Sequence, residues 1–201
     1  FKLFFALKNH EVYKASGILD RVIEILLREG DQHNEVQSRS LAVSFLGAAW
    51  VEFENYLKDQ EDLQASILNI IKRATRDKSS VLKITAIAQL FTLLSHLYNQ
   101  RNSVASVVFK SLTFLLVENY SLEPVREFVS YNFLVVLDEI PSLPVQGIIE
   151  PLAKQHQLAE HVDLNLCDFD LFLSLARHPC IDLEGSIQLL DILVKVFLNN
   201  S

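Results

Sequence analysis

Residues 61–99, EDLQASILNIIKRATRDKSSVLKITAIAQLFTLLSHLYN, decide the fold class of this 201-residue chain. In the first part of this stretch the apolar residues lie three or four positions apart, as one face of an α-helix requires. These positions are Leu63, Ile67, Ile70, Ile71 and Ala74. The second part, from Val81 onward, is apolar around most of its circumference, which is typical of a helix packed between neighbours. The stretch therefore predicts two consecutive helices in an all-α protein.

The same alternation of one-faced and nearly all-apolar segments continues on both sides of this stretch. The chain has only 5 Gly and 5 Pro, too few for the repeated turns of a β-sandwich. Pairs of segments recur at intervals of about 40–45 residues, the spacing of α-helical repeats. The expected helices lie near residues 18–29, 35–55, 60–75, 80–99, 103–119, 124–139, 145–158, 167–176 and 183–198.

Two runs near the beginning of the chain resemble a known repeat family. Residues 15–27 place Gly17 just before a short helix with paired apolar positions, and residues 36–50 carry small residues at Gly47-Ala48-Ala49. This pattern resembles an armadillo repeat. The later helix pairs are similar to HEAT repeats, because Gly does not recur at the matching place.

The resemblance implies a right-handed α-solenoid of stacked armadillo/HEAT-like repeats. It covers residues 11–140 as regular repeats and leaves 141–201 less regular, within a single domain over residues 1–201. Proteins of such families usually bind an extended partner along a curved surface, so the resemblance implies protein binding.

The formal charge of −7 is unevenly distributed along the chain. Residues 1–100 carry 12 basic and 12 acidic residues, whereas residues 101–201 carry 6 and 13. A nucleic-acid binder needs a net basic face, so we expect no nucleic-acid partner. The mean hydropathy is +0.22. We assign it to a helical core, because nearly uncharged runs such as 84–95 and 102–117 are shorter than the ~20 residues of a membrane span.

Five basic residues gather around the turn between the two helices of the opening stretch. They are Lys72, Arg73, Arg76, Lys78 and Lys83. Their charges predict a binding surface for an acidic peptide, an acidic protein tail or a phosphate-bearing ligand. The alternative is a solvated helix end whose positive charges compensate the helix dipole. Single-stranded nucleic acids would also require aromatic side chains, which this stretch lacks.

A second conspicuous set is aromatic. The set consists of Phe45, Trp50, Phe53 and Tyr56; Phe45, Ala49 and Phe53 share one predicted helix face, and Trp50 lies beside them. We expect these side chains to pack in the core between adjacent repeats, because aromatic residues dominate core burial. An exposed aromatic groove that anchors a partner peptide is the alternative.

Residues that could support metal or nucleophilic chemistry are few. His161, Cys167, His178 and Cys180 have ligand chemistry suited to zinc, but twelve residues separate the cysteines and no C-x-x-C pair occurs. We therefore expect a helix-terminal His178, two small buried Cys and no cofactor. Two Cys are also too few for a disulfide framework, which suggests a reducing compartment.

Three carboxylates, Asp163, Asp168 and Asp170, alternate with apolar residues. The ligand positions and central Gly of a calcium-binding EF-hand loop are missing. We expect Asp163 or Asn165 to cap a short helix, with Asp168 and Asp170 on its solvated face.

These observations favour a non-enzymatic, cytoplasmic scaffold that binds other proteins and belongs to a larger complex. One alternative is a structural subunit of a ciliary or microtubule-associated assembly, in which the basic residues meet the acidic tubulin surface. Another is a metal-dependent or Cys/His enzyme, or its regulatory domain, that uses His161, Cys167, His178 and Cys180.

The two ends of the sequence are strongly apolar. The residues concerned are Phe4, Phe5 and Leu7 at one end and Val196, Phe197 and Leu198 at the other. Terminal repeats of a solenoid normally present a polar outer face, so we expect the isolated chain to associate. The chain begins at Phe1 and contains no Met, which indicates a piece of a longer polypeptide.

Overall fold

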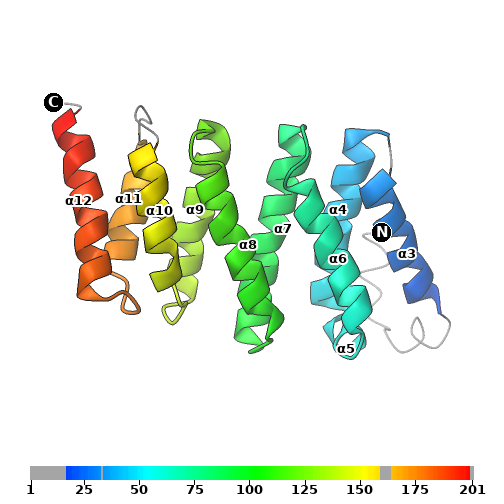
Figure 1. The fold of residues 1–201 in the computed structure, drawn as a ribbon. Helices are drawn as coiled ribbons and strands as arrows, with labels where there is room; N and C mark the ends of the chain where they lie inside the picture. Colours follow the sequence, from blue (N-terminus) through cyan, green and yellow to red (C-terminus); the bar gives the residue numbers. More distant parts are fainter. Residues whose placement is uncertain (1–16, 33, 159–163, 200–201) are drawn as a thin grey trace. The chain divides into compact units, whose positions relative to one another are not determined.

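The computed structural model describes residues 17–32, 34–158 and 164–199, which form ten α-helices and no strand (Figure 1). The all-α prediction is confirmed for the described residues. The nine expected helices are found with ends within three residues of the expected ones, but the helix expected over residues 35–55 is divided at Phe53 into two helices. The helices are α3 (Ile18–Gln32), α4 (Val36–Glu52), α5 (Glu54–Leu57), α6 (Glu61–Ala74), α7 (Ser80–Asn99), α8 (Val104–Glu118), α9 (Glu123–Glu139), α10 (Gln146–Leu158), α11 (Leu166–Ala176) and α12 (Leu183–Asn199).

The helices gather into two compact units, residues 1–105 and residues 106–201. Helix α8 begins at Val104, so nearly all of it belongs to the second unit. The single domain expected over residues 1–201 stays a prediction.

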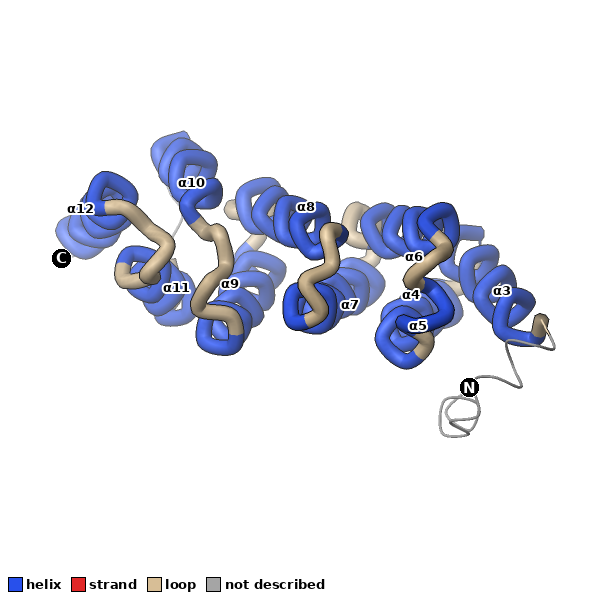
Figure 2. Tube along the Cα trace, turned by 90° about the horizontal axis from the view of Figure 1, so that it is seen from below, coloured by secondary structure: helices blue, strands red, loops and turns tan. Residues whose placement is uncertain are grey.

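Two layers of helices build the first unit (Figure 2). Helices α3 and α6 pack side by side in one layer, and α4 and α7 do so in the other. Within each consecutive pair, α3 with α4 and α6 with α7, the two helices also contact each other across the layers. The side chains between the layers are fully buried, among them Ile23, Leu46, Ile67, Leu90 and Leu94. Their apolar spacing is the one the sequence shows, so burial of one face explains why each segment is helical.

Helix α4 crosses α7 closely at Gly47. A Cβ atom at this position would lie 2.1 Å from Oε1 and 3.1 Å from Cβ of Gln89. The small residue therefore lets the two helices approach. Gly17, just before α3, has φ of +66°, a left-handed conformation that glycine adopts at low cost.

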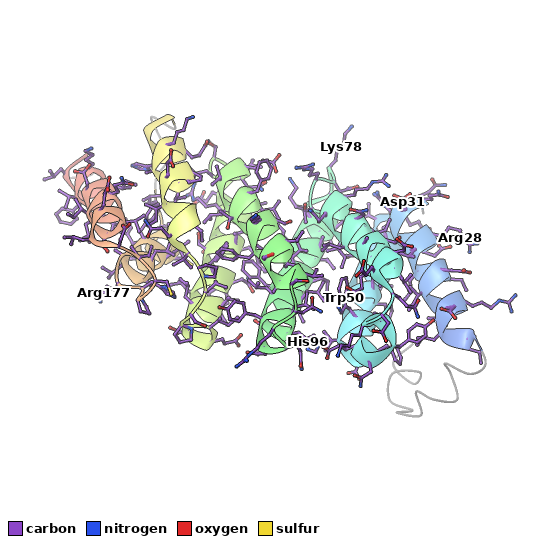
Figure 3. The ribbon with its side chains drawn as sticks, turned by 60° about the horizontal axis from the view of Figure 1, so that its bottom comes forward. Arg28, Asp31, Trp50, Lys78, His96 and Arg177 are labelled. Atoms are coloured by element: carbon purple, nitrogen blue, oxygen red, sulfur yellow. The ribbon has the colours of Figure 1, made fainter. Side chains whose placement is uncertain are left out.

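The aromatic set around the end of α4 lies mainly in the core of the first unit, and Trp50 is labelled in Figure 3. Trp50 is 1% exposed and Phe53 2% exposed, whereas Phe45 and Tyr56 are half-buried. Core packing is therefore confirmed for Trp50 and Phe53, and the alternative of an exposed groove around them is wrong. The chain also bends at Phe53, which separates α4 from α5.

Among the described helices, α7 alone is long and apolar enough to cross a membrane by length and composition. Its buried residues are Leu82, Ala86, Ile87, Leu90, Phe91, Leu93, Leu94 and Leu97. They lie in the first unit, where α7 contacts α4 and α6, as the central helix of a core does. The absence of a membrane span stays a prediction.

The second unit has the same kind of packing. Helix α9 packs against α11, α10 against α12, and α11 contacts α12. Helix α8 joins α9 through an edge-to-face contact of Phe109 and Phe133, whose ring centroids are 6.4 Å apart. Fully buried side chains of this core include Leu112, Phe133 and Phe172.

A buried ion pair crosses the core of the second unit. Arg126 of α9 donates from Nε to Oδ2 of Asp168 in α11 at 2.8 Å, and their side chains are 3% and 2% exposed. Ser130 donates to Oδ1 of the same carboxylate at 2.8 Å, and Arg126 also donates to the Tyr120 carbonyl at 2.6 Å. Asp168 was expected on a solvated face, and that prediction is wrong. Its charge is tolerated in the core because a cation and hydrogen-bond donors surround it.

The N-terminus of α11 shows why Asp168 turns inward. Asn165 accepts a hydrogen bond from the Asp168 N–H at 2.9 Å, and Asp168 accepts one from the Asn165 N–H at 3.2 Å, which together form a capping box. Capping by Asn165 is therefore confirmed, and Asp170 is exposed as expected. Asp163 lies outside the described residues.

Candidate functional site

The five predicted basic residues lie around the turn that joins α6 to α7. Lys72 and Arg73 occupy the last turn of α6, where positive charge compensates the helix dipole. Arg76 and Lys78 belong to the turn itself, and Lys83 lies in the first part of α7. The structure thus brings all five to one end of the first unit.

Two ion pairs connect this turn to neighbouring helices. Arg73 reaches Asp31 at the end of α3, with 2.5 Å between Nη1 and Oδ1. Arg39 of α4 donates from Nη1 to Oδ2 of Asp77 at 2.8 Å. Arg39 therefore adds a sixth cation to the group, which we call the basic end: Arg39, Lys72, Arg73, Arg76, Lys78 and Lys83. Sequence reasoning missed Arg39 because it lies 38 residues from its partner Asp77.

Asp77 holds the turn in place. Its Oδ1 accepts a hydrogen bond from the Ser79 N–H at 2.8 Å, while Oδ2 accepts the one from Arg39. The Ser79 N–H lowers the pKa of Asp77, and the Arg39 guanidinium lowers it further, although partial burial opposes both. The Ser79 hydroxyl in turn caps α7 by accepting from the Leu82 N–H at 3.5 Å. The basic side chains are thus presented by a fixed turn.

The cations of the basic end differ in how far they are neutralised. Within the part of the chain that the structure describes, Lys72, Lys78 and Lys83 make no ion pair. Lys78 projects away from the ribbon (Figure 3), and Arg73 keeps 69% of its side chain exposed despite its partner Asp31. Dipole compensation therefore accounts for Lys72 and Arg73 but not for Lys78 or Lys83, which lie beyond the end of α6.

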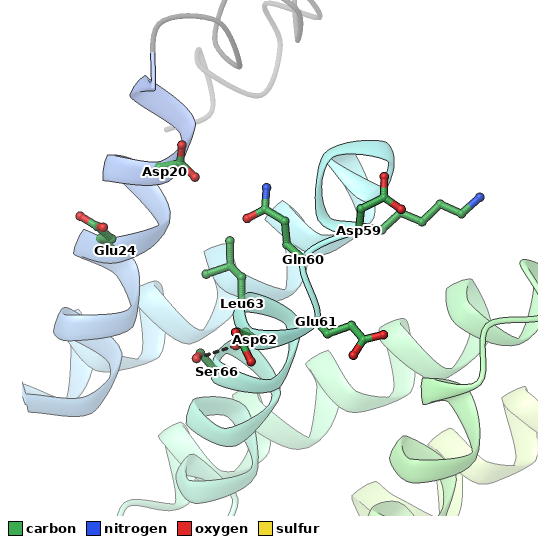
Figure 4. Close-up of a pocket in the computed structure, with 9 residues that line it drawn as sticks. Asp20, Glu24, Asp59, Gln60, Glu61, Asp62, Leu63 and Ser66 are labelled. Atoms are coloured by element: carbon green, nitrogen blue, oxygen red, sulfur yellow. Dashed lines mark hydrogen bonds between the residues drawn. The ribbon is translucent and has the colours of Figure 1, made fainter.

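The opposite end of the first unit carries an acidic hollow of about 820 Å³ (Figure 4). It lies between the first part of α3 and the turn that leads into α6. Of the described residues that line it, Lys58 is the only basic one. The carboxylates that line it are Asp20, Glu24, Asp59, Glu61 and Asp62. Sequence reasoning missed this hollow because its two walls are about 35 residues apart in the chain.

The two charged ends share one physical cause. Helices α3 and α6 run in the same direction, since the Asp31–Arg73 pair joins their last turns and the hollow joins their first parts. Their N-termini, with Asp20, Glu61 and Asp62 in the first turns, therefore lie at the acidic end. Residues 1–100 are neutral in sum, but the described part of the first unit has a cluster of cations at one end and a cluster of carboxylates at the other, about 20 Å apart over the length of a helix.

The Cys and His residues do not form a comparable site. His178 is buried and its Nδ1 accepts a hydrogen bond from the Cys180 N–H at 3.2 Å, whereas Cys167 lies on α11. Burial, with Asp168, Glu127 and Asp170 nearby, raises the pKa of the Cys167 thiol and so disfavours the thiolate that metals and nucleophilic chemistry need. Among the described residues, no group of three or more His, Cys, Asp or Glu is placed to hold a metal ion. His161 lies outside those residues.

Burial of these residues differs from the sequence expectation. Two small buried cysteines were expected, but Cys167 is half-buried and Cys180 is exposed. Their thiols face different carbonyl groups, those of Glu127 and Pro141, at 3.9 and 3.7 Å.

The fold and the charged ends define an all-helical protein with a candidate electrostatic binding surface. No family model, no curated protein and no solved structure matches the chain.

Proposed function

We propose that this chain is a non-enzymatic protein-interaction scaffold of the right-handed armadillo/HEAT solenoid type, which binds an acidic segment of a partner protein at its basic end. The solenoid assignment is supported by the packing inside each unit. Helices two places apart along the repeat pack together in one layer, as α3 with α6, α4 with α7, α9 with α11 and α10 with α12 do. Stacking of this kind is the property that defines helical repeat proteins.

The observation that carries the binding proposal is the group of cations around the α6–α7 turn. Arg73, Arg76 and Lys78 are exposed, and Arg39, Lys72 and Lys83 are half-buried. Six cations converge there, of which Arg73 pairs with Asp31 and Arg39 pairs with Asp77. Lys72, Lys78 and Lys83 therefore have positive charge available for a partner. Because the turn is already held in one conformation, it loses little conformational entropy on binding. A carboxylate-rich peptide matches this surface.

The test is a charge reversal with a matched control. The triple variant Lys72→Glu, Lys78→Glu, Lys83→Glu changes the net charge by −6 and leaves the Arg73–Asp31 and Arg39–Asp77 ion pairs in place. The control reverses three other lysines: Lys58, Lys110 and Lys154. Binding of a fluorescent poly-glutamate peptide is measured by anisotropy at low and at high salt.

We expect the basic-end variant to bind the peptide about tenfold or more weakly, and the control to bind closer to wild type. Both variants change the net charge by the same amount, so a difference in peptide affinity between them reports where on the protein the reversed lysines lie. Equal loss in both variants would show that the peptide senses only the overall charge, and the binding proposal would fail. Circular dichroism checks that both variants remain helical.

The same surface supports a second candidate, a structural role in a ciliary or microtubule-associated assembly within the cytoplasm. The acidic surface of tubulin has the charge that the basic end requires. Salt-sensitive cosedimentation with microtubules that the basic-end triple variant abolishes, and the control retains, would favour this role.

A further inference from the structure

Ser80 is an exposed serine at the first position of α7, between Lys78 and Lys83 of the basic end. Its hydroxyl makes no hydrogen bond within the part of the chain that the structure describes. The hydroxyl of its neighbour Ser79, in contrast, caps α7 by accepting from the Leu82 N–H at 3.5 Å. The Ser80 hydroxyl therefore has no structural role, and it is accessible for covalent modification.

The charges along the chain around Ser80 are almost all positive. Arg76 and Lys78 precede it by four and two positions, and Lys83 follows it by three. The one carboxylate between Arg76 and Lys83 is Asp77, which is already held in an ion pair. Protein kinases select their substrates by the pattern of charge around the acceptor residue. The segment therefore matches a kinase whose substrate groove is acidic.

The start of α7 opens at low cost. The first N–H groups of a helix have no partner within the helix, so few bonds hold its first turn. At Ser79 these bonds run from the Leu82 N–H to the hydroxyl at 3.5 Å and from the Lys83 N–H to the carbonyl at 3.0 Å. Helices fray from their ends, so a kinase reaches Ser80 in an extended segment while the buried part of α7 stays packed.

We propose that Ser80 is a phosphorylation site, and that its phosphate prevents the acidic partner from binding at the basic end. This regulation rests on the proposed function, whereas the modification site itself does not. The reaction transfers the terminal phosphoryl group of a nucleoside triphosphate, the second substrate of the kinase. The O–H bond of Ser80 breaks and its proton goes to a carboxylate base of the kinase. A bond forms from Oγ to phosphorus, the bond from phosphorus to the bridging oxygen breaks, and a nucleoside diphosphate leaves.

The phosphate adds negative charge at a position where the helix tolerates it. It carries a charge of about −1.5 to −2 at pH 7. Ser80 and Lys83 are three residues apart on α7, so their side chains are neighbours on the helix surface. The first turn of a helix also favours negative charge because of the helix dipole. Phosphorylation therefore offsets the charges of Lys78 and Lys83 and leaves α7 folded.

A kinase assay on the 201-residue chain tests the modification site. The chain is incubated with a protein kinase that requires Arg or Lys near its acceptor serine, and phosphorylated residues are identified by mass spectrometry. We expect phosphate on Ser80, and we expect the double variant Arg76→Ala, Lys78→Ala to lower the rate by about tenfold or more, because it removes the charges that the kinase recognises. Phosphate on other residues with none on Ser80 would refute the site.

A matched control is Ser121, which is also exposed and makes no hydrogen bond within the described residues. Its charged neighbours in the sequence are acidic, Glu118 and Glu123. The same kinase should therefore leave Ser121 unmodified. Phosphoserine incorporated during translation at position 80, or at position 121 as the control, gives two proteins with the same added charge.

Phosphorus NMR of these two proteins tests the surroundings of the phosphate without any partner. The second pKa of phosphoserine is about 6, and nearby cations lower it. We expect the phosphate at position 80 to titrate at least about half a unit below the one at position 121, and Lys83→Met to reduce this difference. Equal titration at the two positions would contradict the contact with the basic end.

Binding of the fluorescent poly-glutamate peptide tests the regulation. We expect the phosphate at position 80 to weaken binding by about threefold or more, and the phosphate at position 121 to leave it closer to that of the unmodified chain. Equal effects of the two phosphates would overturn the regulation. A wild-type chain that does not bind the peptide would refute the proposed function and the regulation together; the kinase and NMR results would then decide the modification site alone.

Discussion

Replacing Asp168 by Ala should destabilise the second unit more than a change at any exposed carboxylate. The Asp168 side chain accepts hydrogen bonds from Arg126 and Ser130 at 2.8 Å and from the Asn165 N–H at 3.2 Å. Without it, the Arg126 guanidinium remains in the core with the Tyr120 carbonyl and ring as neighbours. Breaking one side of a buried ion pair costs about 3–5 kcal/mol. This cost includes the loss of the hydrogen bond from the Asn165 N–H, which is one half of the capping box.

This magnitude is large compared with the ~5–15 kcal/mol by which a folded domain is usually stable. Urea denaturation followed by circular dichroism measures the free energy of unfolding. Asp170→Ala is the matched control, because Asp170 is an exposed carboxylate two positions away on the same helix. We expect the control to change the free energy of unfolding by about 0.5 kcal/mol or less.

A double-mutant cycle separates the ion pair from its surroundings. Arg126→Met removes the cation and keeps most of the side-chain volume, so the double variant Arg126→Met, Asp168→Ala should cost less than the sum of the single variants, by at least about 1 kcal/mol. If Asp168→Ala prevents folding, Asp168→Asn provides the same comparison with the hydrogen-bond acceptor retained. Additive single variants, or a cost of Asp168→Ala below about 1 kcal/mol, would refute the reasoning.

Four further predictions concern the two units. Trp50 emission should be blue-shifted and protected from acrylamide, because the side chain is 1% exposed; emission at the wavelength of free tryptophan would contradict its placement. Gly147→Ala should raise the free energy of unfolding by about 0.4–1 kcal/mol, because a Cβ there meets no atom within 4 Å. Gly47→Val should lower it by about 1–3 kcal/mol, because Gln89 leaves no room; urea titrations of both variants decide. Burial lowers the pKa of His178 in the folded chain. The unfolded state therefore takes up a proton first as the pH falls below about 6.5, and stability should decrease there, less so in His178→Gln.

The sequence predicted the helices well because the signals for a helix are local. Apolar spacing selects the buried face, and residues such as Ser79 and Asn165 satisfy backbone N–H groups at helix starts. These signals act over a few residues, so each helix could be placed from the stretch that forms it. Burial of Trp50 followed from the same reasoning, because it lies beside the apolar face of its own helix.

The candidate site was predicted only where its residues are neighbours in the chain. The cations from Lys72 to Lys83 form a cluster that the sequence itself displays. Arg39 and the acidic hollow depend on helices α3, α4 and α6 packing together, and no local pattern reports that contact. The net charge of residues 1–100 is zero, and this number gave no sign of the basic end or of the acidic hollow. A charge count along the chain does not include the direction in which each helix runs.

Only some of the apolar residues predicted at the two ends of the sequence lie within the described residues. Phe197 and Leu198 are exposed as expected. The side chain of Val196 and residues Phe4, Phe5 and Leu7 lie outside the described residues. Leu183 and Ile187, in the first part of the same helix, are also exposed. The sequence shows that α12 is apolar on two sides, but it cannot show which side its own unit covers.

By itself, then, the amino-acid sequence determined an all-α chain, the positions of its helices and the cations of one turn, because each depends on residues within a few turns of one another. The tertiary structure alone decided that Asp168 is buried, that a cluster of cations and a cluster of carboxylates lie at opposite ends of the first unit, and that one face of α12 is exposed. Each of these depends on partners tens of residues away. The energy of a buried charge or an apolar face is set by what packs against it, and packing is a property of the folded chain.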